Sequence, residues 1–321
     1  MAGPVFRLSL VFGSVVIVGL CYLALFLDGS SVGQLIDAVF GGGDDFKDVV
    51  LRDFRVPRIL LAILVGAALS VAGAIMQVVT RNPLADPGLL GITHGAYLAI
   101  VLGFLVGYVT PFWNLLIVPL LGASIAAGLV YFIGNIVTPG QLILVGVALT
   151  ALISGLARSV ALINQDIFDV IRHWAVGSLD YKKIDTVYIS FPLILAGILI
   201  ALMMMSSLNV LSIDKDISKS LGVGKTALWS YIAVIALSAG STAAVGPISF
   251  LALAAAHISR VISGPNLLRI IPLCLITGPI VLLTADTLGR VLTPTGLDAG
   301  VVVPFLGAPI LIFLSRKVKV F

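Results

Sequence analysis

Long apolar stretches, separated mostly by short polar connections, constrain this chain more than any other feature. A helix needs about 20 predominantly apolar residues to cross a bilayer, and stretches of about that length recur along the whole sequence. A surface helix of a soluble domain would instead carry one apolar stripe and one polar face. The pattern therefore predicts an all-α polytopic membrane protein with about ten transmembrane helices. We place these spans at about 8–27, 57–79, 92–109, 115–137, 142–163, 186–205, 227–245, 247–262, 270–285 and 299–315.

The composition leaves room for spans and connections and for little else. The chain has 321 residues, of which 60% are hydrophobic and 11% charged, against about 25% charged residues in soluble domains. Ten spans take up roughly 200 residues, so that about 120 remain for the termini and connections. No separate soluble domain fits into that remainder, and we interpret residues 1–321 as a single transmembrane domain.

Cysteine usage and charge exclude two further classes of protein. The two cysteines, Cys21 and Cys274, lie in apolar stretches far apart in sequence, which excludes a disulfide framework or a Cys-rich metal site. The net charge of +4 is spread over many connections, which argues against a nucleic-acid-binding surface.

The N-terminus is predicted to be cytoplasmic. The stretch 8–27 is longer than the apolar region of a signal peptide and lacks an Ala-x-Ala cleavage site before Asp28, so we interpret it as an uncleaved first span. This orientation places ten Lys and Arg residues inside and nine outside, which supports it weakly. The basic tail at 316–319 favours a cytoplasmic C-terminus as well.

Three connections are long enough to have a function of their own. The outer connection at 28–56 is rich in Gly and Asp and reads as a solvated loop, either a plain linker or a contact with a partner. The other two are an outer connection at 164–185 and an inner connection at 206–226.

Two further segments interrupt the helical pattern. Gly246-Pro247 joins the seventh and eighth spans and predicts a broken or re-entrant element, because Pro removes a backbone donor and Gly admits unusual dihedral angles. The segment 81–91 contains two prolines and two glycines, which predicts a shaped turn between the second and third spans.

The sequence offers no residues for enzymatic catalysis. The string Gly222 to Thr226 suggests a phosphate-binding loop, but the motif also needs a glycine at the position that Lys219 occupies. The three histidines are scattered without the spacing of metal ligands. We therefore expect neither ATP binding nor a metal site in this chain.

Four charged residues close to predicted span ends are candidates for a functional role. Asp286 and Arg290 stand four residues apart, which is the spacing of a local ion pair on a helix. The alternative is that Arg290 has a role at the outer rim. Arg55 and Arg58 flank Val56-Pro57 before the second span, and two arginines at a pore mouth suit a partner that carries carboxylates. The alternative for this pair is anchoring at the membrane interface.

Several motifs together resemble the FecCD-type permeases, which are membrane subunits of ATP-binding-cassette importers for iron–siderophore complexes, haem and vitamin B12. The motifs follow the family's order from about residue 50 to the C-terminus. They are Arg55-Val56-Pro57-Arg58, Gly66-Ala67, Gly73 with Gln77, the run from Arg81 to Gly91, Trp174 with Gly177-Ser178-Leu179, Ser220-Leu221-Gly222-Val223, Gly246 to Phe250 with His257 and Arg260, Ala285-Asp286 with Arg290, and Leu306 to Pro309.

The resemblance implies an assembly of the type II importer architecture in a bacterial cytoplasmic (inner) membrane. This multi-pass chain would pair with a second permease subunit, identical or paralogous, with the substrate path at the interface. Two cytoplasmic ATP-binding subunits would hold ATP and Mg, and this chain would bind no cofactor. An extracytoplasmic binding protein would deliver the substrate.

The resemblance also implies roles for individual residues. Arg55, Arg58 and Arg290 would pair with acidic residues of the binding protein. The inner connection would dock on the ATPase through Leu211, Asp214, Asp216, Lys219, Leu221 and Gly222.

The fifth span is the predicted lining of the substrate path. A large rigid chelate needs a wide passage without strongly attracting charges, and the stretch from Leu142 to Ile163 is rich in small residues. The residues of this span expected to line the path are Gly146, Thr150 and Ser154, where bulky substitutions should reduce uptake.

The expected substrate is a ferric siderophore, ahead of haem and then cobalamin. The stretch from Asn164 through Trp174 to Asp180 looks most like permeases for catecholate siderophores. Two other classes remain open at this point. An ion-coupled secondary transporter would need an intramembrane acid, for which Asp286 is best placed, and a membrane scaffold would need no ATPase.

Overall fold

A computed structural model describes most of the chain, and every predicted span coincides with a helix. The described residues are 4–27, 30–41, 45–107, 114–134, 139–163, 168, 174–213, 226–293 and 296–315. The ten helices that match the predicted spans are α1 (Pro4–Phe26), α4 (Val56–Val79), α5 (Ile92–Leu105), α6 (Asn114–Gly134), α7 (Pro139–Ile163), α9 (Ile184–Met203), α12 (Thr226–Val245), α13 (Leu251–Ser263), α14 (Leu267–Leu292) and α15 (Ala299–Ser315). Within the described residues, five helical segments are long and apolar enough to cross a membrane, and the other matching helices are shorter or carry shorter apolar stretches.

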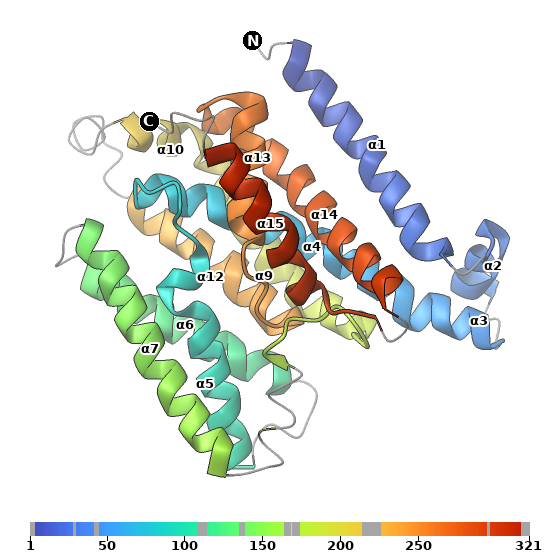
Figure 1. Ribbon diagram of the computed structural model, residues 1–321, viewed down its shortest axis with the longest axis horizontal. Coiled ribbons are helices and arrows are strands. Elements are labelled where there is room, and N and C mark those ends of the chain that lie inside the picture. Colours follow the sequence, from blue (N-terminus) through green and yellow to red (C-terminus); the bar gives the residue numbers. More distant parts are fainter. Residues whose placement is uncertain are drawn as a thin grey trace.

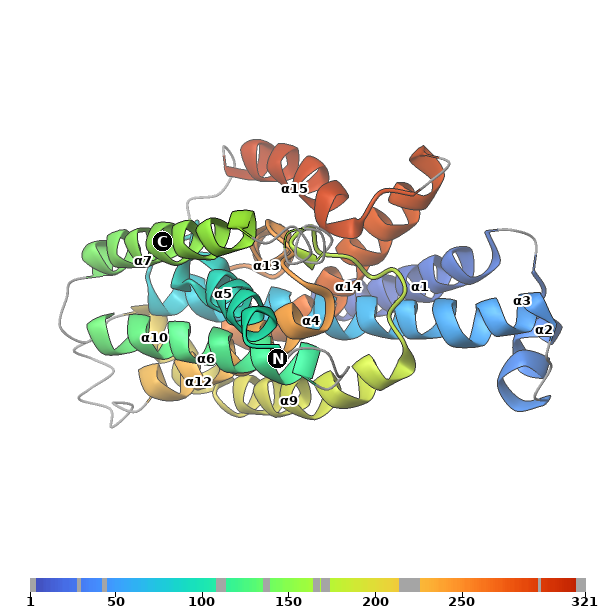
Figure 2. The same cartoon turned by 90° about the horizontal axis from the view of Figure 1, so that it is seen from below.

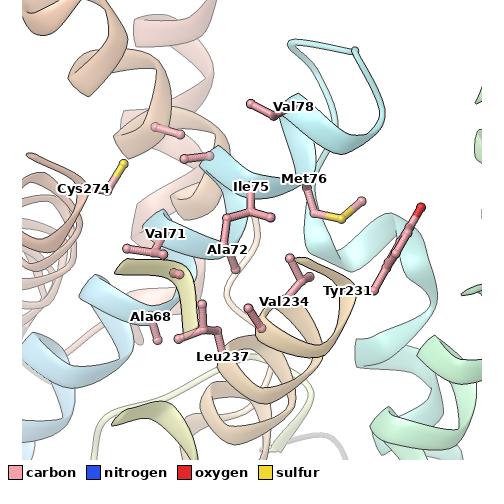
Figure 3. Close-up of a cluster of buried hydrophobic side chains, with 14 of the residues drawn as sticks. Ala68, Val71, Ala72, Ile75, Met76, Val78, Tyr231, Val234, Leu237 and Cys274 are labelled. Atoms are coloured by element: carbon pink, nitrogen blue, oxygen red, sulfur yellow. The ribbon is translucent and has the colours of Figure 1, made fainter. Parts of the chain in front are cut away.

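Helix α4 forms the centre of the bundle and α1 lies at its edge (Figures 1 and 2). The segment Phe46–Val79 contains α4 and extends it toward the N-terminus, and its apolar 18-residue stretch is 83% buried. The corresponding stretch of α1 is only 11% buried. The largest core cluster joins one face of α4 to α12, where Ala68, Ala72 and Met76 meet Val234, Leu237 and Tyr231 (Figure 3). The second span is therefore a structural axis on which α9, α12, α13 and α14 pack.

Helices α4 and α14 cross in close contact because both carry glycine at the crossing. A Cβ on Gly66 would meet backbone atoms of Gly278 at 2.8 Å, and a Cβ on Gly278 would collide with the carbonyl oxygen of Gly66. One turn further along, the Ser70 hydroxyl donates to the carbonyl oxygen of Cys274 at 2.6 Å. Small residues at such spacing allow membrane helices to approach closely and to form hydrogen bonds across the interface.

The outer connection at 28–56 is not the solvated loop that its Gly and Asp content predicts. It contains two short helices, α2 (Val32–Ile36) and α3 (Phe46–Val49), followed by the π-helical turns η1 (Asp37–Gly41) and η2 (Val50–Arg55) respectively. Ser31 begins the first helix with a capping box, in which its hydroxyl accepts from the Gln34 backbone and the Gln34 side chain accepts from the Ser31 backbone. Asp45 caps the second helix, which continues through η2 into α4.

The predicted break between the seventh and eighth spans is confirmed. Helix α12 ends at Val245 and α13 begins at Leu251, and Gly246 and Phe250 both have positive φ angles, of 81° and 66°. A Cβ on Gly73 of α4 would collide with the carbonyl oxygen of Ala252, so the N-terminal end of α13 lies within the bundle.

The predicted turn at 81–91 also forms, and it returns into the bundle. It contains a short 3₁₀ helix, η3 (Pro87–Leu90), capped by the Asp86 carboxylate, which accepts from the Gly88 backbone at 2.7 Å. Asp86 and Gly88 line a small cavity with Leu69, an interior residue of α4. Helix α5 therefore also begins inside the protein, as the broken helices of many transporters do.

Candidate functional site

The three arginines predicted at the outer mouth lie around one cavity. This outer cavity has a volume of about 420 Å³, and Arg55, Arg58 and Arg290 all line it. Its other lining residues are Phe46, Val50, Phe54, Asp180 and Tyr181. Because α4 and α14 are antiparallel neighbours, the beginning of one and the end of the other supply arginines to the same place.

Arg58 is held by two carboxylates from distant parts of the chain. Its Nε donates to both carboxylate oxygens of Asp286 at 3.0 and 2.8 Å, and its Nη2 donates to Asp286 Oδ1 at 2.8 Å. Its Nη1 also donates to Asp180. The side chains of Arg58 and Asp286 are only 13% and 1% exposed. Asp286 is thus held by a guanidinium from α4, which packs on α14, while Arg290 lies at the outer cavity, the second of its two predicted positions.

Arg55 and Arg290 bind the C-terminal end of α1. Arg55 Nη1 donates to the carbonyl oxygen of Leu25, and Arg290 Nη1 donates to that of Ala24 at 2.8 Å. These carbonyls lie in the last turn of α1, where backbone acceptors have no partner within the helix and the helix dipole is negative. The two arginines thus attach the peripheral α1 to the bundle and also bring positive charge to the outer cavity.

Lys182 and Asp298 add charge to the same outer region. Burial lowers the pKa of Lys182, and the carboxylate of Asp298 partly opposes that shift. Lys182 follows the two residues of the outer cavity, Asp180 and Tyr181, directly in sequence.

The three predicted path residues on α7 have different surroundings. Gly146 is buried. Thr150 lies beside Gly91, at the end of the re-entrant turn. Ser154 lines a second cavity of about 290 Å³, and its hydroxyl donates to the Ala151 carbonyl within the helix at 3.1 Å. These three residues thus lie toward the interior of this chain, and their role in the path stays a prediction.

This second cavity, which we call the inner cavity, combines aromatic and polar side chains. It lies where α7 faces the first turns of α5, the residues before α9 and the break between α12 and α13. Its lining residues are Thr93, His94, Tyr97, Ser154, Arg158, Trp174, Ala175, Pro247 and Ser249. The rings of Tyr97 and Trp174 stack with centroids 6.4 Å apart and planes inclined by 22°.

One short segment connects the two cavities. Trp174 and Ala175 line the inner cavity, and Asp180 and Tyr181 line the outer one. Between them, Gly177 adopts a φ of 77° and packs so closely on Pro247 that a Cβ would collide with the Pro247 carbonyl oxygen. The Ser178 backbone donates to Val245 at 2.8 Å. The segment therefore joins the outer cavity to the break between α12 and α13.

Two residues of these cavities, Arg158 and Asp180, are functional candidates that the sequence motifs did not include. Arg158 is a basic residue inside an apolar span, which by itself marks a functional candidate. Asp180 had no such signal, because nothing in the sequence relates it to Arg58, which lies 122 residues earlier.

Most of the predicted ATPase-coupling residues cannot be placed. Asp214, Asp216, Lys219, Leu221 and Gly222 lie outside the described residues. Leu211 belongs to α10 (Met205–Ile213), and its side chain is 6% exposed within the main core cluster. The structure therefore gives Leu211 a packing role.

Comparisons with known proteins extend over nearly the whole chain. The model of the FecCD transport family matches residues 14–317. The ferric enterobactin transport system permease protein of Escherichia coli (strain K12) is 40% identical over 291 residues, covering 88% of this chain and 86% of that protein. The iron(3+)-hydroxamate import system permease protein of Bacillus subtilis (strain 168) is 37% identical over 298 residues, covering 88% of each chain. A solved structure of a metal-chelate type ABC transporter in an inward-facing conformation has a TM-score of 0.85 at 25% identity, covering 96% of this chain and 99% of that chain.

Proposed function

Because this chain belongs to the FecCD transport family, we propose that it moves a ferric siderophore of the catecholate type across the cytoplasmic membrane. The chain is a multi-pass permease of the inner membrane and a subunit of an ABC importer. It is not itself an enzyme, since ATP hydrolysis in such importers is done by separate ATPase subunits. The resemblance inferred from the sequence motifs is confirmed.

The identity of 40% to a ferric enterobactin permease carries the proposal for the substrate. Enterobactin binds iron through catecholate groups, and the stretch around Trp174 to Asp180 resembles permeases for such chelates. The hydroxamate permease at 37% identity supports the wider class of ferric siderophores. Haem and cobalamin remain the alternatives within the family.

The proposed assembly contains a second permease subunit, two ATP-binding subunits and an extracytoplasmic binding protein. The outer cavity is the proposed place where this binding protein docks. Arg55, Arg58 and Arg290 line it, and Asp180 is the one carboxylate among its described lining residues. Acidic side chains of a binding protein would complement the three arginines that line this cavity.

Neutralising two of these arginines should weaken the response to the binding protein. In liposomes that contain the complete importer, Arg55→Gln/Arg290→Gln should raise the binding-protein concentration for half-maximal ATPase stimulation by about tenfold, which corresponds to about 1.4 kcal/mol. Glutamine keeps a donor for the α1 carbonyls, so that the variant loses charge with little loss of structure. The measurement is ATP hydrolysis against the concentration of substrate-loaded binding protein.

Arg52→Gln is the matched control, because it removes an arginine from the same segment outside the outer cavity. Arg52 is paired with Asp53 at 3.0 Å, and both side chains are more than a third exposed. A shift in the control equal to that of the double variant would refute the docking site. Hydrolysis that never responds to any binding protein, or uptake without an ATPase, would refute the importer function.

An ion-coupled carrier is less compatible with the structure. Its best candidate acid was Asp286, which is buried and held by three hydrogen bonds from Arg58. A coupling-ion site needs a carboxylate that can exchange its partner during transport.

A further inference from the structure

The inner cavity has the chemistry of a binding site for an aromatic anion. We propose that it binds one deprotonated catecholate arm of the substrate, with Arg158 as the charge partner and the stacked pair of Tyr97 and Trp174 as the aromatic wall. This inference rests on the proposed function and adds to it the residues that recognise the substrate.

The charge of the inner cavity is positive. Arg158 is exposed in this chain and makes no ion pair with a described carboxylate. None of the described residues that line the inner cavity is acidic. Asp86 lines a separate small cavity, where its carboxylate accepts a hydrogen bond from the Gly88 backbone.

Two helix N-termini reinforce this charge. Thr93 and His94 stand at the beginning of α5, and Ser249 stands just before α13. Both helices begin inside the protein, where the positive end of a helix dipole is screened less than at the surface. Arg158 therefore has two further sources of positive potential beside it.

The polar groups of the walls are incompletely satisfied. His94 Nδ1 and Trp174 Nε1 are buried and have no hydrogen-bond partner among the described residues. Buried polar atoms are rarely left without a partner, and such exceptions often mark a ligand site. A catecholate arm offers an aromatic face for the ring wall and oxygen atoms that can accept from Trp174 Nε1 and, in the tautomer protonated at Nδ1, from His94.

The size of the inner cavity limits what it can hold. Its volume of about 290 Å³ is at the lower end of the range for small-molecule sites and suits one aromatic arm of a chelate. Arg158, Ala175 and Ser249 are exposed at its rim. The remainder of the chelate would lie beyond this rim, where the second permease subunit is proposed to pack.

A neutral chelate provides the comparison that isolates charge. Iron(III) with three catecholates is a trianion, whereas iron(III) with three hydroxamates is neutral. If the inner cavity binds a catecholate arm through Arg158, loss of that charge must weaken binding of the tris-catecholate and leave the affinity for the tris-hydroxamate unchanged.

The test measures equilibrium binding of a radioiron-labelled ferric tris-catecholate to the purified permease–ATPase complex in nanodiscs, without binding protein. Arg158→Gln should raise the dissociation constant by about tenfold or more, as expected for a lost charge-assisted contact. Arg158→Lys should recover most of the affinity because it keeps the charge. Ser159→Gln, at the next position of α7, which is also exposed, should change nothing.

Trp174→Leu tests the aromatic wall independently. It should weaken binding of the tris-catecholate, whereas Trp174→Phe should retain most of the affinity. Equal dissociation constants for wild type and Arg158→Gln, or equal effects of Arg158→Gln on the tris-hydroxamate chelate, would overturn the inference.

Failure of the inference and failure of the proposed function give different results. If the ATPase responds to the binding protein but Arg158→Gln leaves the tris-catecholate dissociation constant unchanged, the importer function stands and the proposed site is refuted. If binding of the tris-catecholate depends on Arg158 but ATP hydrolysis does not respond to the binding protein, the site stands and the importer function is refuted.

Discussion

Gly278→Ala is expected to destabilise the protein by about 3 kcal/mol or more, because the added methyl group has no space in the contact between α4 and α14. A Cβ at this position would collide with the carbonyl oxygen of Gly66 and would stand 2.5 Å from the Ser70 hydroxyl oxygen. Backbone atoms cannot rotate away as a side-chain end can, so the two helices would have to separate. Separation would also break the hydrogen bond from Ser70 to the Cys274 carbonyl.

The measurement is thermal unfolding of the detergent-solubilised protein, with size-exclusion chromatography to follow aggregation. Gly19→Ala is the matched control, since it makes the same change in the peripheral α1, where a Cβ would have no heavy atom within 4 Å. We expect a fall of at least several degrees in the apparent melting temperature for Gly278→Ala and little change for Gly19→Ala. Equal melting temperatures would show that α4 and α14 do not touch at these glycines.

The sequence predicts the helices well because the bilayer sets their length. Each of the ten apolar stretches became a helix, and the break at Gly246-Pro247 formed where the backbone chemistry of Gly and Pro places it. The prediction of a loop at 28–56 was wrong, because this segment forms two short helices. Its Gly and Asp content is typical of a loop, but Ser31 and Asp45 are also helix-capping residues, and in the structure each begins a helix.

The candidate site was less predictable because its contacts join distant parts of the chain. Asp286 and Arg290 are four residues apart and look like a pair, but the contact that forms joins Asp286 to Arg58 across 228 residues. The inner cavity likewise combines side chains from α5, α7 and two connections. The sequence pattern of one helix contains no information about which neighbouring helix supplies the partner of a charged side chain.

The ion pair of Arg58 and Asp286 is the second place where a single substitution should have a large effect. Arg58→Met should destabilise the protein by about 3–5 kcal/mol, because it leaves the almost fully buried carboxylate of Asp286 without the guanidinium that binds it. Asp286→Asn should cost less. Arg58 would then still bind Asp180, whose side chain is 31% exposed and partly hydrated.

The double variant Arg58→Met/Asp286→Leu separates the cost of a broken pair from the value of the pair itself. Replacing both partners of a buried ion pair by apolar residues is often neutral, so this variant should be closer in stability to wild type than Arg58→Met alone. Thermal unfolding of wild type, Arg58→Met, Asp286→Leu and the double variant gives the coupling energy as a double-mutant cycle. Additive effects of the two substitutions would mean that the pair does not form. Recovery of stability without recovery of binding-protein-stimulated ATP hydrolysis would assign to Arg58 a role in docking beyond holding α4 to α14, because packing alone would then be restored.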